Sequence, residues 1–264
     1  MAQIALKIDV DTWRGTRDGA PALARMLERA GAPATFLFSL GPDHTGRAIR
    51  RVLRPGFFGK VARTSVVEHY GVRTLLYGTL LPGPDIGRRE AATLRAIAAA
   101  GFETGVHAWD HVAWQDGVAR ASDDWTLRHM RRATERYVEI FGVSPRVHGA
   151  AGWQMNDAAY RIEAELGYSI ASDTRGSEPY LPVDSSQREL GPVQLPTTLP
   201  TLDELLGRDA WDASNVHRAL LEATDAGVTE HVYTLHAELE GHKLLAVFER
   251  LLVGWRAHGH TFVN

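Results

Sequence analysis

The chain alternates between two patterns of hydrophobic and polar positions. Short runs rich in Val, Ile, Leu and Phe are typical of buried strands, whereas longer runs with an apolar residue every three or four positions are typical of amphipathic helices. The short runs predict strands at residues 4–10, 34–40, 102–107, 146–150, 168–173, 192–196, 232–236 and 260–263. The longer runs predict helices at residues 20–30, 88–100, 123–141, 157–166, 216–226 and 243–257. Ser122 is expected to cap the start of the helix at 123–141.

The order of these elements predicts the fold class. Repeated β-then-α units favour a mostly parallel sheet, either open or closed into a barrel. A length of 264 residues suits one (β/α) barrel, and no internal repeat, low-complexity tract or Gly/Ser linker divides the chain. We therefore expect an α/β protein with a single domain over residues 1–264 that is a variant of the (β/α) barrel.

One segment, residues 41–87, is too long for an ordinary connection between a strand and a helix. Its stretch from His44 to Val67 contains six Arg or Lys residues and no acidic residue. Apolar side chains such as Phe57 and Phe58 are interleaved with the basic ones. This mixture suits contact with an anionic membrane or lipid surface, and the alternative is a solvated basic subdomain that packs its apolar side chains inward.

The overall composition is that of a globular protein, with 44% hydrophobic and 23% charged residues. It excludes the disordered, collagen-like and disulfide-stapled classes. The formal charge of −3 conceals a basic stretch at 44–67 within an otherwise acidic chain, and it does not favour a nucleic-acid partner. The sequence has neither a signal-peptide pattern nor an apolar run of about 18 residues, so we expect a cytoplasmic location.

Two carboxylates lie close together at the end of the first predicted strand. Asp9 and Asp11 stand two residues apart, so their side chains point to the same face of the strand. Such a pair repels unless a cation or a shared proton relieves it, and the carboxyl ends of barrel strands are where active sites form. The alternative is a pair of solvated loop carboxylates.

Two histidines after the third predicted strand add possible metal ligands. His107 and His111 stand at helical spacing, which places them on one face of a helix. Because the chain has no Cys, a metal must be bound by His, Asp or Glu. With Asp11 the histidines make a set of two imidazoles and one carboxylate, which suits Zn²⁺ or another divalent transition metal. The alternative is a pair of histidines on a helix surface.

A further histidine, His236, ends the predicted strand at 232–236. An imidazole at that position can act as a general acid near neutral pH. The alternative is a histidine at the edge of the core that is hydrogen-bonded to the backbone.

The sequence resembles the NodB-type polysaccharide deacetylases, a carbohydrate esterase 4-like family. The motifs that carry the resemblance are, in this order, Asp9 and Asp11, His107 and His111, and the Leu-His pair that ends at His236. The resemblance implies a distorted (β/α) barrel, here with a long insertion after the second strand. It also implies that Asp11, His107 and His111 hold one divalent metal ion, with Zn²⁺ as the first choice and Co²⁺, Mn²⁺ or Ni²⁺ as alternatives. In this family Asp9 would be the general base and His236 the general acid.

Further segments resemble a subgroup of this family that deformylates lipid-linked sugars, namely residues 7–17, 38–43, 105–111, 150–153, 172–176, 195–200 and 236–241. This implies a hydrolase that removes the N-formyl group from 4-deoxy-4-formamido-L-arabinose-phosphoundecaprenol, in lipid A modification and polymyxin resistance. It would act peripherally at the cytoplasmic face of the inner membrane. The alternatives are an N-deacetylase of another lipid-linked or soluble amino sugar, a non-haem iron oxygenase with a triad of two histidines and one carboxylate, and a lipid-binding protein with a degenerate site.

Four residues in these segments are candidates for direct substrate contact. Arg14 and Arg17 suit the phosphate oxygens of the lipid carrier, and the alternative for them is a surface salt bridge. Trp109 and Trp153 suit stacking on the sugar ring, and the alternative for them is buried packing.

Asp173 and Arg175 are expected to support Asp9. The chain departs from the resemblance at Gln154, where an arginine that orients the base is expected. Since a neutral amide cannot replace that charge, the pKa of Asp9 is expected to be less depressed. The resemblance also leads us to expect that relatives continue beyond the position of Asn264.

Overall fold

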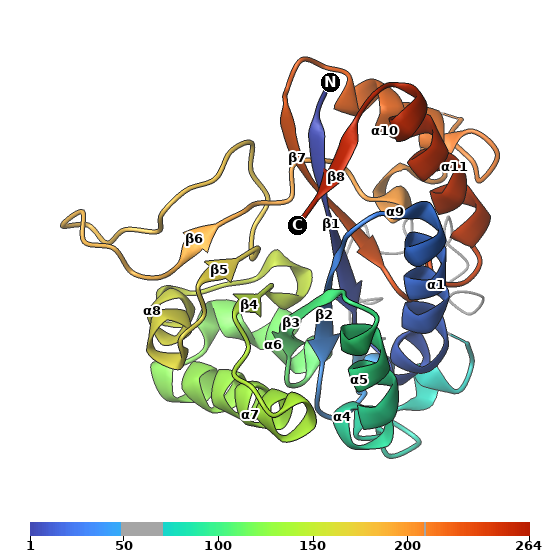
Figure 1. The fold of residues 1–264 in the computed structure, drawn as a ribbon. Helices are drawn as coiled ribbons and strands as arrows, with labels where there is room; N and C mark the ends of the chain where they lie inside the picture. Colours follow the sequence, from blue (N-terminus) through green and yellow to red (C-terminus); the bar gives the residue numbers. More distant parts are fainter. Residues whose placement is uncertain (49–70, 209) are drawn as a thin grey trace.

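The computed structural model describes residues 1–48, 71–208 and 210–264. In this part of the chain, helices surround a curved sheet of parallel strands (Figure 1). The strands are hydrogen-bonded in the order β6-β5-β4-β3-β2-β1-β7, and β8 pairs with the first residues of β1. Their bounds are β1 Gln3–Val10, β2 Thr35–Ser39, β3 Glu103–Ala108, β4 Val147–His148, β5 Ile170–Ala171, β6 Val193–Gln194, β7 Glu230–His236 and β8 Thr261–Val263.

Helices connect most successive strands, the exception being β5 and β6, so the β-then-α order expected from the sequence is confirmed in the main. Those predicted at 20–30, 123–141 and 157–166 have the predicted bounds. The α-helices are α1 Ala20–Ala30, α4 Ile86–Arg89, α5 Ala91–Ala99, α6 His111–Gly117, α7 Asp123–Phe141, α8 Asp157–Leu166, α9 Leu202–Leu205, α10 Val216–Thr224 and α11 Leu245–Ala257.

The barrel is distorted between β6 and β7. In the described residues these strands share no ladder, and the chain that follows β6 bridges the gap instead. The backbone N–H of Thr198 donates to the carbonyl of Val232 at 3.0 Å. The hydroxyls of Thr197 and Thr234 lie 2.7 Å apart. The strands therefore form a half-barrel, and hydrogen bonds from Thr197 and Thr198 to β7 span the side between β6 and β7.

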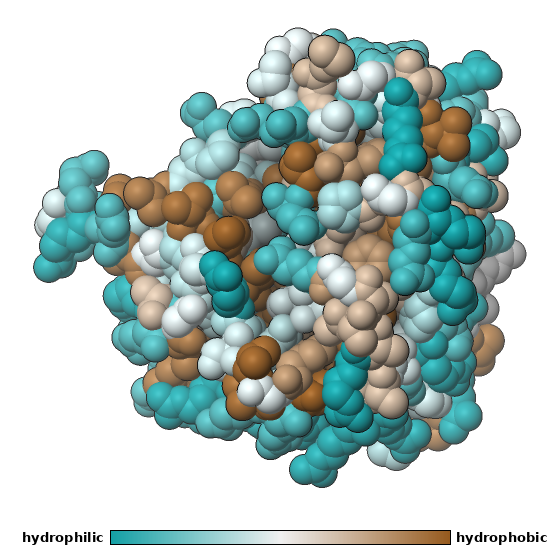
Figure 2. Space-filling model, in the orientation of Figure 1, coloured by the Kyte–Doolittle hydropathy of each residue, from teal (hydrophilic) through white to brown (hydrophobic). Residues whose placement is uncertain are grey.

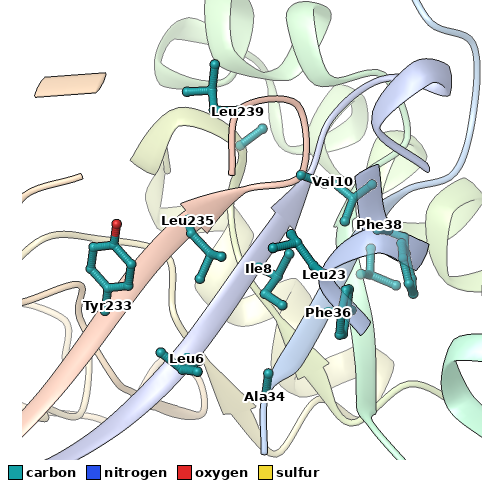
Figure 3. Close-up of a cluster of buried hydrophobic side chains, with 14 of the residues drawn as sticks. Leu6, Ile8, Val10, Leu23, Ala34, Phe36, Phe38, Tyr233, Leu235 and Leu239 are labelled. Atoms are coloured by element: carbon teal, nitrogen blue, oxygen red, sulfur yellow. The ribbon is translucent and has the colours of Figure 1, made fainter. Parts of the chain in front are cut away.

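The alternation of side chains along β1 separates the core from the site. Leu6 and Ile8 are at most 1% exposed and pack with Leu23 of α1 in the hydrophobic cluster of Figure 3. Burying each such side chain stabilises the fold by about 1.5–3 kcal/mol. A slip of one residue would exchange the two faces of the strand, so the register is strongly specified. Lys7 and Asp9 are thereby held on the opposite face.

The helix predicted at 88–100 is broken at Glu90, which separates α4 from α5. Glu90 has φ −109° and ψ 16°, outside the helical region. Its carboxylate accepts a hydrogen bond from the indole N–H of Trp13 at 2.6 Å. The partner is distant in sequence, so the pattern of apolar residues did not reveal the break. The predicted cap of α7 is confirmed, because the Ser122 hydroxyl accepts from the N–H of Trp125.

The insertion at 41–87 is described only at its two ends. The N–H of Gly46 donates to the carbonyl of Tyr77 at 3.0 Å, so the ends lie side by side. Most of the basic residues in the insertion lie outside the described residues, namely Arg50, Arg51, Arg54, Lys60 and Arg63. The expected membrane surface therefore stays a prediction. Across 1–48, 71–208 and 210–264, no helix has the length and apolar character needed to span a bilayer.

The connection between β5 and β6 forms an arm that projects from the molecule (Figure 1). Leu181, Val183 and Val193 are 40–45% exposed, and hydrophobic surface is visible at the base of the arm (Figure 2). A few exposed aliphatic side chains are normal on a protein surface and need no functional explanation.

Candidate active site

The carboxyl ends of three strands bring the five predicted core site residues together. Asp9 in β1 is the register partner of His236 in β7. His107 lies near the end of β3, whereas Asp11 and His111 follow β1 and β3 closely. Because parallel strands present their carboxyl ends at the same edge, these side chains share one end of the barrel.

Asp11, His107 and His111 form a group that can hold one metal ion. The Oδ1 atom of Asp11 is 3.2 Å from Nε2 of His107, and its Oδ2 atom is 3.4 Å from Nε2 of His111. One potential ligand atom from each residue lies within 4.8 Å of the others. Two imidazoles and a carboxylate at this separation fit the usual donor set of Zn²⁺ and leave positions open for water and substrate.

The orientation of His107 also fits a metal. Its Nδ1 atom lies 2.6 Å from the carbonyl oxygen of Gly149. A carbonyl can only accept, so Nδ1 carries the hydrogen, and Nε2 is the ring nitrogen that faces Asp11 and can offer its lone pair to a metal. Oδ1 of Asp11 is buried and has no hydrogen-bond partner among the described residues. Two facing electron-pair donors are stable when a cation lies between them.

The two histidines do not meet in the way that their spacing predicted. His107 belongs to strand β3 and His111 is the first residue of α6, so they do not share a helix face. Their rings lie 5.3 Å apart because the chain turns sharply between them. Asp110 makes that turn: its Oδ1 accepts from the N–H of Ala113 at 3.0 Å and caps α6. The predicted proximity is found, but a strand-to-helix turn produces it.

The charge on Asp11 is stabilised by its neighbours. Burial by itself raises the pKa of the Asp11 carboxyl, but His111, His107 and His236 lower it well below its ordinary value. Asp11 is therefore ionised near neutral pH, which is the form that binds a metal.

Asp9 is buried beside Lys7, a residue that the sequence did not single out. The Nζ atom of Lys7 donates to the carbonyl of Ser172 at 2.6 Å and lies 3.7 Å from Oδ2 of Asp9. The other oxygen, Oδ1, has no hydrogen-bond partner in the described ranges. Gln154, where an arginine was expected, is exposed and donates to the carbonyl of Gly152. The cation beside Asp9 is Lys7, and the i, i+2 spacing of the two residues was the signal available in the sequence.

Acidic neighbours favour the protonated form of the His236 imidazole. Burial alone lowers the pKa of its imidazole, but acidic neighbours led by Asp11 and Asp203 raise it to about 9. The ring therefore carries a proton near neutral pH. Its backbone N–H donates to Glu240 at 2.9 Å, which fixes the end of β7. The buried Nδ1 atom has no hydrogen-bond partner within the described parts of the chain.

Glu238 organises the turn that carries Asp11 and was also missed from the sequence. Its Oε1 atom accepts from the N–H of Asp11 at 3.0 Å, from the N–H of Thr12 at 2.8 Å and from the Thr12 hydroxyl at 2.9 Å. A Cβ on Gly15 would come within 1.8 Å of the same oxygen. The turn after β1 is thus shaped around a buried carboxyl group, which only the folded chain reveals.

The two candidate arginines lie beside the site and already have neighbours. Arg17 forms an ion pair with Asp18 at 2.6 Å, and its guanidinium lies 4.8 Å from the ring centroid of Trp13. Arg14 lies near Gly71, which belongs to the insertion at 41–87. Arg17 therefore forms the surface salt bridge that was the alternative for it. Contact with the lipid phosphate stays a prediction for Arg14 and Arg17.

The two candidate tryptophans differ in their surroundings. Trp109 is 8% exposed, Arg132 covers its ring at 4.2 Å, and Gly41 packs against it. The structure therefore favours the packing alternative for Trp109. Trp153 is half-buried and lies edge-to-face with His236, 6.4 Å between ring centroids. Trp153 is thus the one of the two that borders the candidate general acid.

Asp173 and Arg175 have partners other than Asp9. Asp173 is buried, accepts from the N–H of Ala150 at 2.7 Å and lies 2.9 Å from Nδ1 of His148. Arg175 pairs with Glu204 at 2.6 Å and stacks over the ring of Trp153. The expected support of Asp9 by this pair stays a prediction.

Comparison with known proteins gives consistent relatives. The family model described as polysaccharide deacetylase matches residues 3–171. A curated relative from Shewanella sediminis, named as a probable 4-deoxy-4-formamido-L-arabinose-phosphoundecaprenol deformylase ArnD, is 36% identical over 267 residues, covering 100% of this chain and 84% of the relative. A protein of the same name from Wigglesworthia glossinidia brevipalpis is 30% identical over 239 residues, covering 90% of this chain and 82% of its own.

Solved structures share the fold. A probable polysaccharide deacetylase from Pseudomonas aeruginosa aligns with a TM-score of 0.64 at 16% identity, over 100% of this chain and 88% of that one. Puue allantoinase aligns with a TM-score of 0.66 at 16% identity, with the same coverage. A family 4 carbohydrate esterase from Streptomyces lividans aligns with a TM-score of 0.55 at 11% identity, over 100% of this chain and 92% of that one. At these identities the likeness concerns the fold alone.

Proposed function

Because the chain belongs to the polysaccharide deacetylase family, we propose that it is a metal-dependent amide hydrolase of a lipid-linked formamido sugar. Its reaction converts 4-deoxy-4-formamido-L-arabinose-phosphoundecaprenol and water into the 4-amino sugar and formate. The observation that carries the proposal is the pair Asp9 and His236, which flanks the Asp11, His107 and His111 group on neighbouring strands. The identity of the substrate rests on the names of the relatives.

The proposed chemistry assigns a separate task to each side chain. A divalent ion held by Asp11, His107 and His111 supplies a Lewis acid that polarises the formyl carbonyl. Oδ1 of Asp9 takes a proton from the attacking water, whose oxygen forms the new bond to the formyl carbon. His236 gives its proton to the amide nitrogen as the C–N bond breaks. Formate and the free amino sugar leave, and the protons on the two residues are restored by exchange with water.

Mass spectrometry of the lipid substrate after incubation tests this function. We expect the formamido sugar to become the amino sugar, with formate released, in a sample loaded with Zn²⁺. A chelator should stop the conversion and added Zn²⁺ should restore it. Unchanged substrate in the metal-loaded sample contradicts the proposal, and conversion of only an N-acetyl analogue assigns the alternative deacetylase activity. The reaction should proceed without O₂, since an oxygen requirement supports the oxygenase alternative.

We also propose Zn²⁺ as the resident ion, because two imidazoles and one carboxylate are a frequent Zn²⁺ donor set. Co²⁺, Mn²⁺ and Ni²⁺ fit the same donors. Metal analysis of the protein purified without added metal, followed by activity after reloading with each ion, distinguishes them. We expect zinc to dominate, and a different dominant ion contradicts the assignment.

The proposed cellular place is the cytoplasmic face of the inner membrane, with residues 41–87 against anionic lipid. The start of the insertion adjoins the site, because Nδ1 of His44 lies 2.6 Å from Oδ2 of Asp110 and Asp43 accepts from the N–H of Trp13. A membrane contact there would bring the site close to a lipid-borne sugar. We expect the protein to sediment with phosphatidylglycerol vesicles at low salt and less at high salt. Equal sedimentation with phosphatidylcholine vesicles contradicts the anionic preference.

A further inference from the structure

Three buried side chains behind the site form a hydrogen-bonded cluster that the proposed reaction does not use. His148, Glu163 and Asp173 are each at most 2% exposed. Nδ1 of His148 lies 2.6 Å from Oε1 of Glu163 and 2.9 Å from Oδ1 of Asp173. Burial by itself lowers the pKa of His148, but Asp173 and Glu163 raise it to about 10. The cluster is therefore an imidazolium held between two carboxyl groups.

The cluster is hydrogen-bonded rather than a second metal site. One oxygen of Glu163 and one oxygen of Asp173 lie at hydrogen-bond distances from the same nitrogen, Nδ1 of His148. Ligand atoms around a tetrahedral Zn²⁺, with bonds of about 2.0–2.1 Å, stand more than about 3 Å apart. A bound metal would require these buried side chains to move apart.

One peptide group connects this cluster to the candidate metal ligand His107. The N–H of Ala150 donates to Oδ1 of Asp173 at 2.7 Å. The carbonyl of the same peptide, on Gly149, accepts from Nδ1–H of His107 at 2.6 Å. Resonance couples the two ends of a peptide unit. A carboxylate that accepts from the N–H end therefore makes the carbonyl end a stronger acceptor.

We propose that Asp173 is a positioning residue for His107, acting through the Gly149–Ala150 peptide to orient the imidazole and strengthen its Nε2 atom as a metal ligand. His148 and Glu163 hold the charge of Asp173 in the barrel interior. Histidine ligands commonly depend on such outer hydrogen-bond partners, whose loss weakens metal binding about 10- to 100-fold. The inference rests on the metal centre of the proposed function, and it does not depend on the identity of the sugar.

Zinc affinity of the full chain tests this role without using activity. We expect Asp173→Asn, which removes the charge and keeps the shape, to bind Zn²⁺ about 10- to 100-fold more weakly in competition with a chelating dye. The matched control is Thr224→Val, which removes a buried hydrogen bond from the indole of Trp255, away from the site. The control should keep wild-type zinc affinity even though it also loses a buried contact.

A second variant keeps the test decisive if Asp173→Asn does not fold by circular dichroism. Glu163→Gln leaves the charge of Asp173 in place and weakens only the neighbour that holds it, so we expect a smaller loss of zinc affinity in the same direction. Wild-type affinity in the folded variant overturns the role of Asp173, and so does an equal loss in Thr224→Val. A wild-type protein that binds no Zn²⁺ overturns the metal centre and this inference together. If Asp173→Asn binds zinc more weakly but the wild type releases no formate, only the proposed reaction is overturned.

Discussion

Lys7 is a charged residue that the fold buries in the middle of its first strand, at 4% exposure. Moving an ammonium group out of water costs several kcal/mol unless its hydrogens find acceptors. Here the carbonyl of Ser172 accepts a hydrogen bond from Lys7, and Oδ2 of Asp9, at 3.7 Å, forms an ion pair with it. Because one carboxylate oxygen of Asp9 faces Lys7, the other is left for the proton transfer that we propose.

Replacing Lys7 tests whether it positions Asp9. We expect Lys7→Met, which keeps the length and removes the charge, to lower kcat about 10- to 100-fold with little change in KM. Lys7→Arg should recover most of the rate because it restores a cation that donates hydrogen bonds. The measurement is formate release together with the zinc content of each protein. A Lys7→Met enzyme of wild-type rate and full zinc content would show that Asp9 needs no such partner.

The proposed acid and base should be separable from the metal centre by mutation. Asp9→Asn and His236→Ala are expected to fold and retain zinc but to lose turnover by about 100- to 10,000-fold, the usual contribution of a general acid or base. Formate release and metal analysis on the same preparations measure both properties. Either variant with a near-normal rate removes that residue from its proposed role.

At the scale of elements, the predictions succeeded where the signal is local. Helices α1, α7 and α8 have the predicted bounds because each combines an amphipathic pattern with sharp ends, such as the left-handed Gly142 after α7 and Gly167 after α8. The break at Glu90 depends on Trp13, and the meeting of His107 with His111 depends on the turn before α6. Contacts of that kind are absent from a local pattern of residues.

The loops after β2 and β3 approach each other closely at Gly41. A Cβ on Gly41 would come within 2.3 Å of the backbone oxygen of Trp109 and 2.6 Å of its ring. Because Trp109 lies between the two candidate histidine ligands in the chain, we expect Gly41→Ala to destabilise the fold by about 1–3 kcal/mol and to weaken zinc binding. Urea unfolding and zinc titration measure these effects.

Gly117 provides the control for that substitution. Its Cβ would meet its nearest neighbour, the ring of Trp125, at 3.5 Å, an ordinary contact. Gly117→Ala should therefore change the free energy of unfolding by no more than about 0.5 kcal/mol. Equal losses of stability in Gly41→Ala and Gly117→Ala would mean that the close approach of Trp109 does not restrict which residue fits at position 41.

On the scale of the whole molecule, the sequence was sufficient for the α/β barrel class and for the family, which the comparisons confirm. It also singled out five candidate site residues that the fold gathers at one end of the barrel, namely Asp9, Asp11, His107, His111 and His236, and their roles stay a prediction. The residues that support them were missed because the contacts that fix them join distant parts of the chain, even though Lys7 also has a local signal in its i, i+2 spacing to Asp9. Lys7 with Ser172 and Glu238 with Asp11 are of this kind.

The buried cluster gives the whole molecule a dependence of stability on pH. The pKa of His148 rises from 6.5 to about 10 on folding, against the effect of burial, because Asp173 and Glu163 face it. The ring of Tyr168 also packs against it at 5.4 Å. A pKa that is raised in the folded state stabilises that state fully below the unfolded value and loses this contribution as the pH rises through the folded value. The contribution of His148 is therefore lost between about pH 6.5 and pH 10.

His148→Gln tests that dependence. Near pH 6.5 the variant should be less stable than the wild type by about 3 kcal/mol or more, because two buried carboxyls lose their cation. Toward pH 10 the difference should shrink. Urea unfolding of both proteins across this range measures it, and a difference that stays constant with pH would contradict the charge assigned to His148.

The register pairing of Asp9 with His236 has a consequence for how such an enzyme changes its substrate. Asp9 and His236 lie in the hydrogen-bonded strands β1 and β7, and moving either residue by one position would turn its side chain to the other face of the sheet. Selection for a different acyl group would therefore act on the connections around the strands and leave the proposed acid and base where they are. A library confined to the connections that do not carry Asp11 and His111 would therefore vary the surroundings of the site and leave the proposed acid, base and metal ligands unchanged.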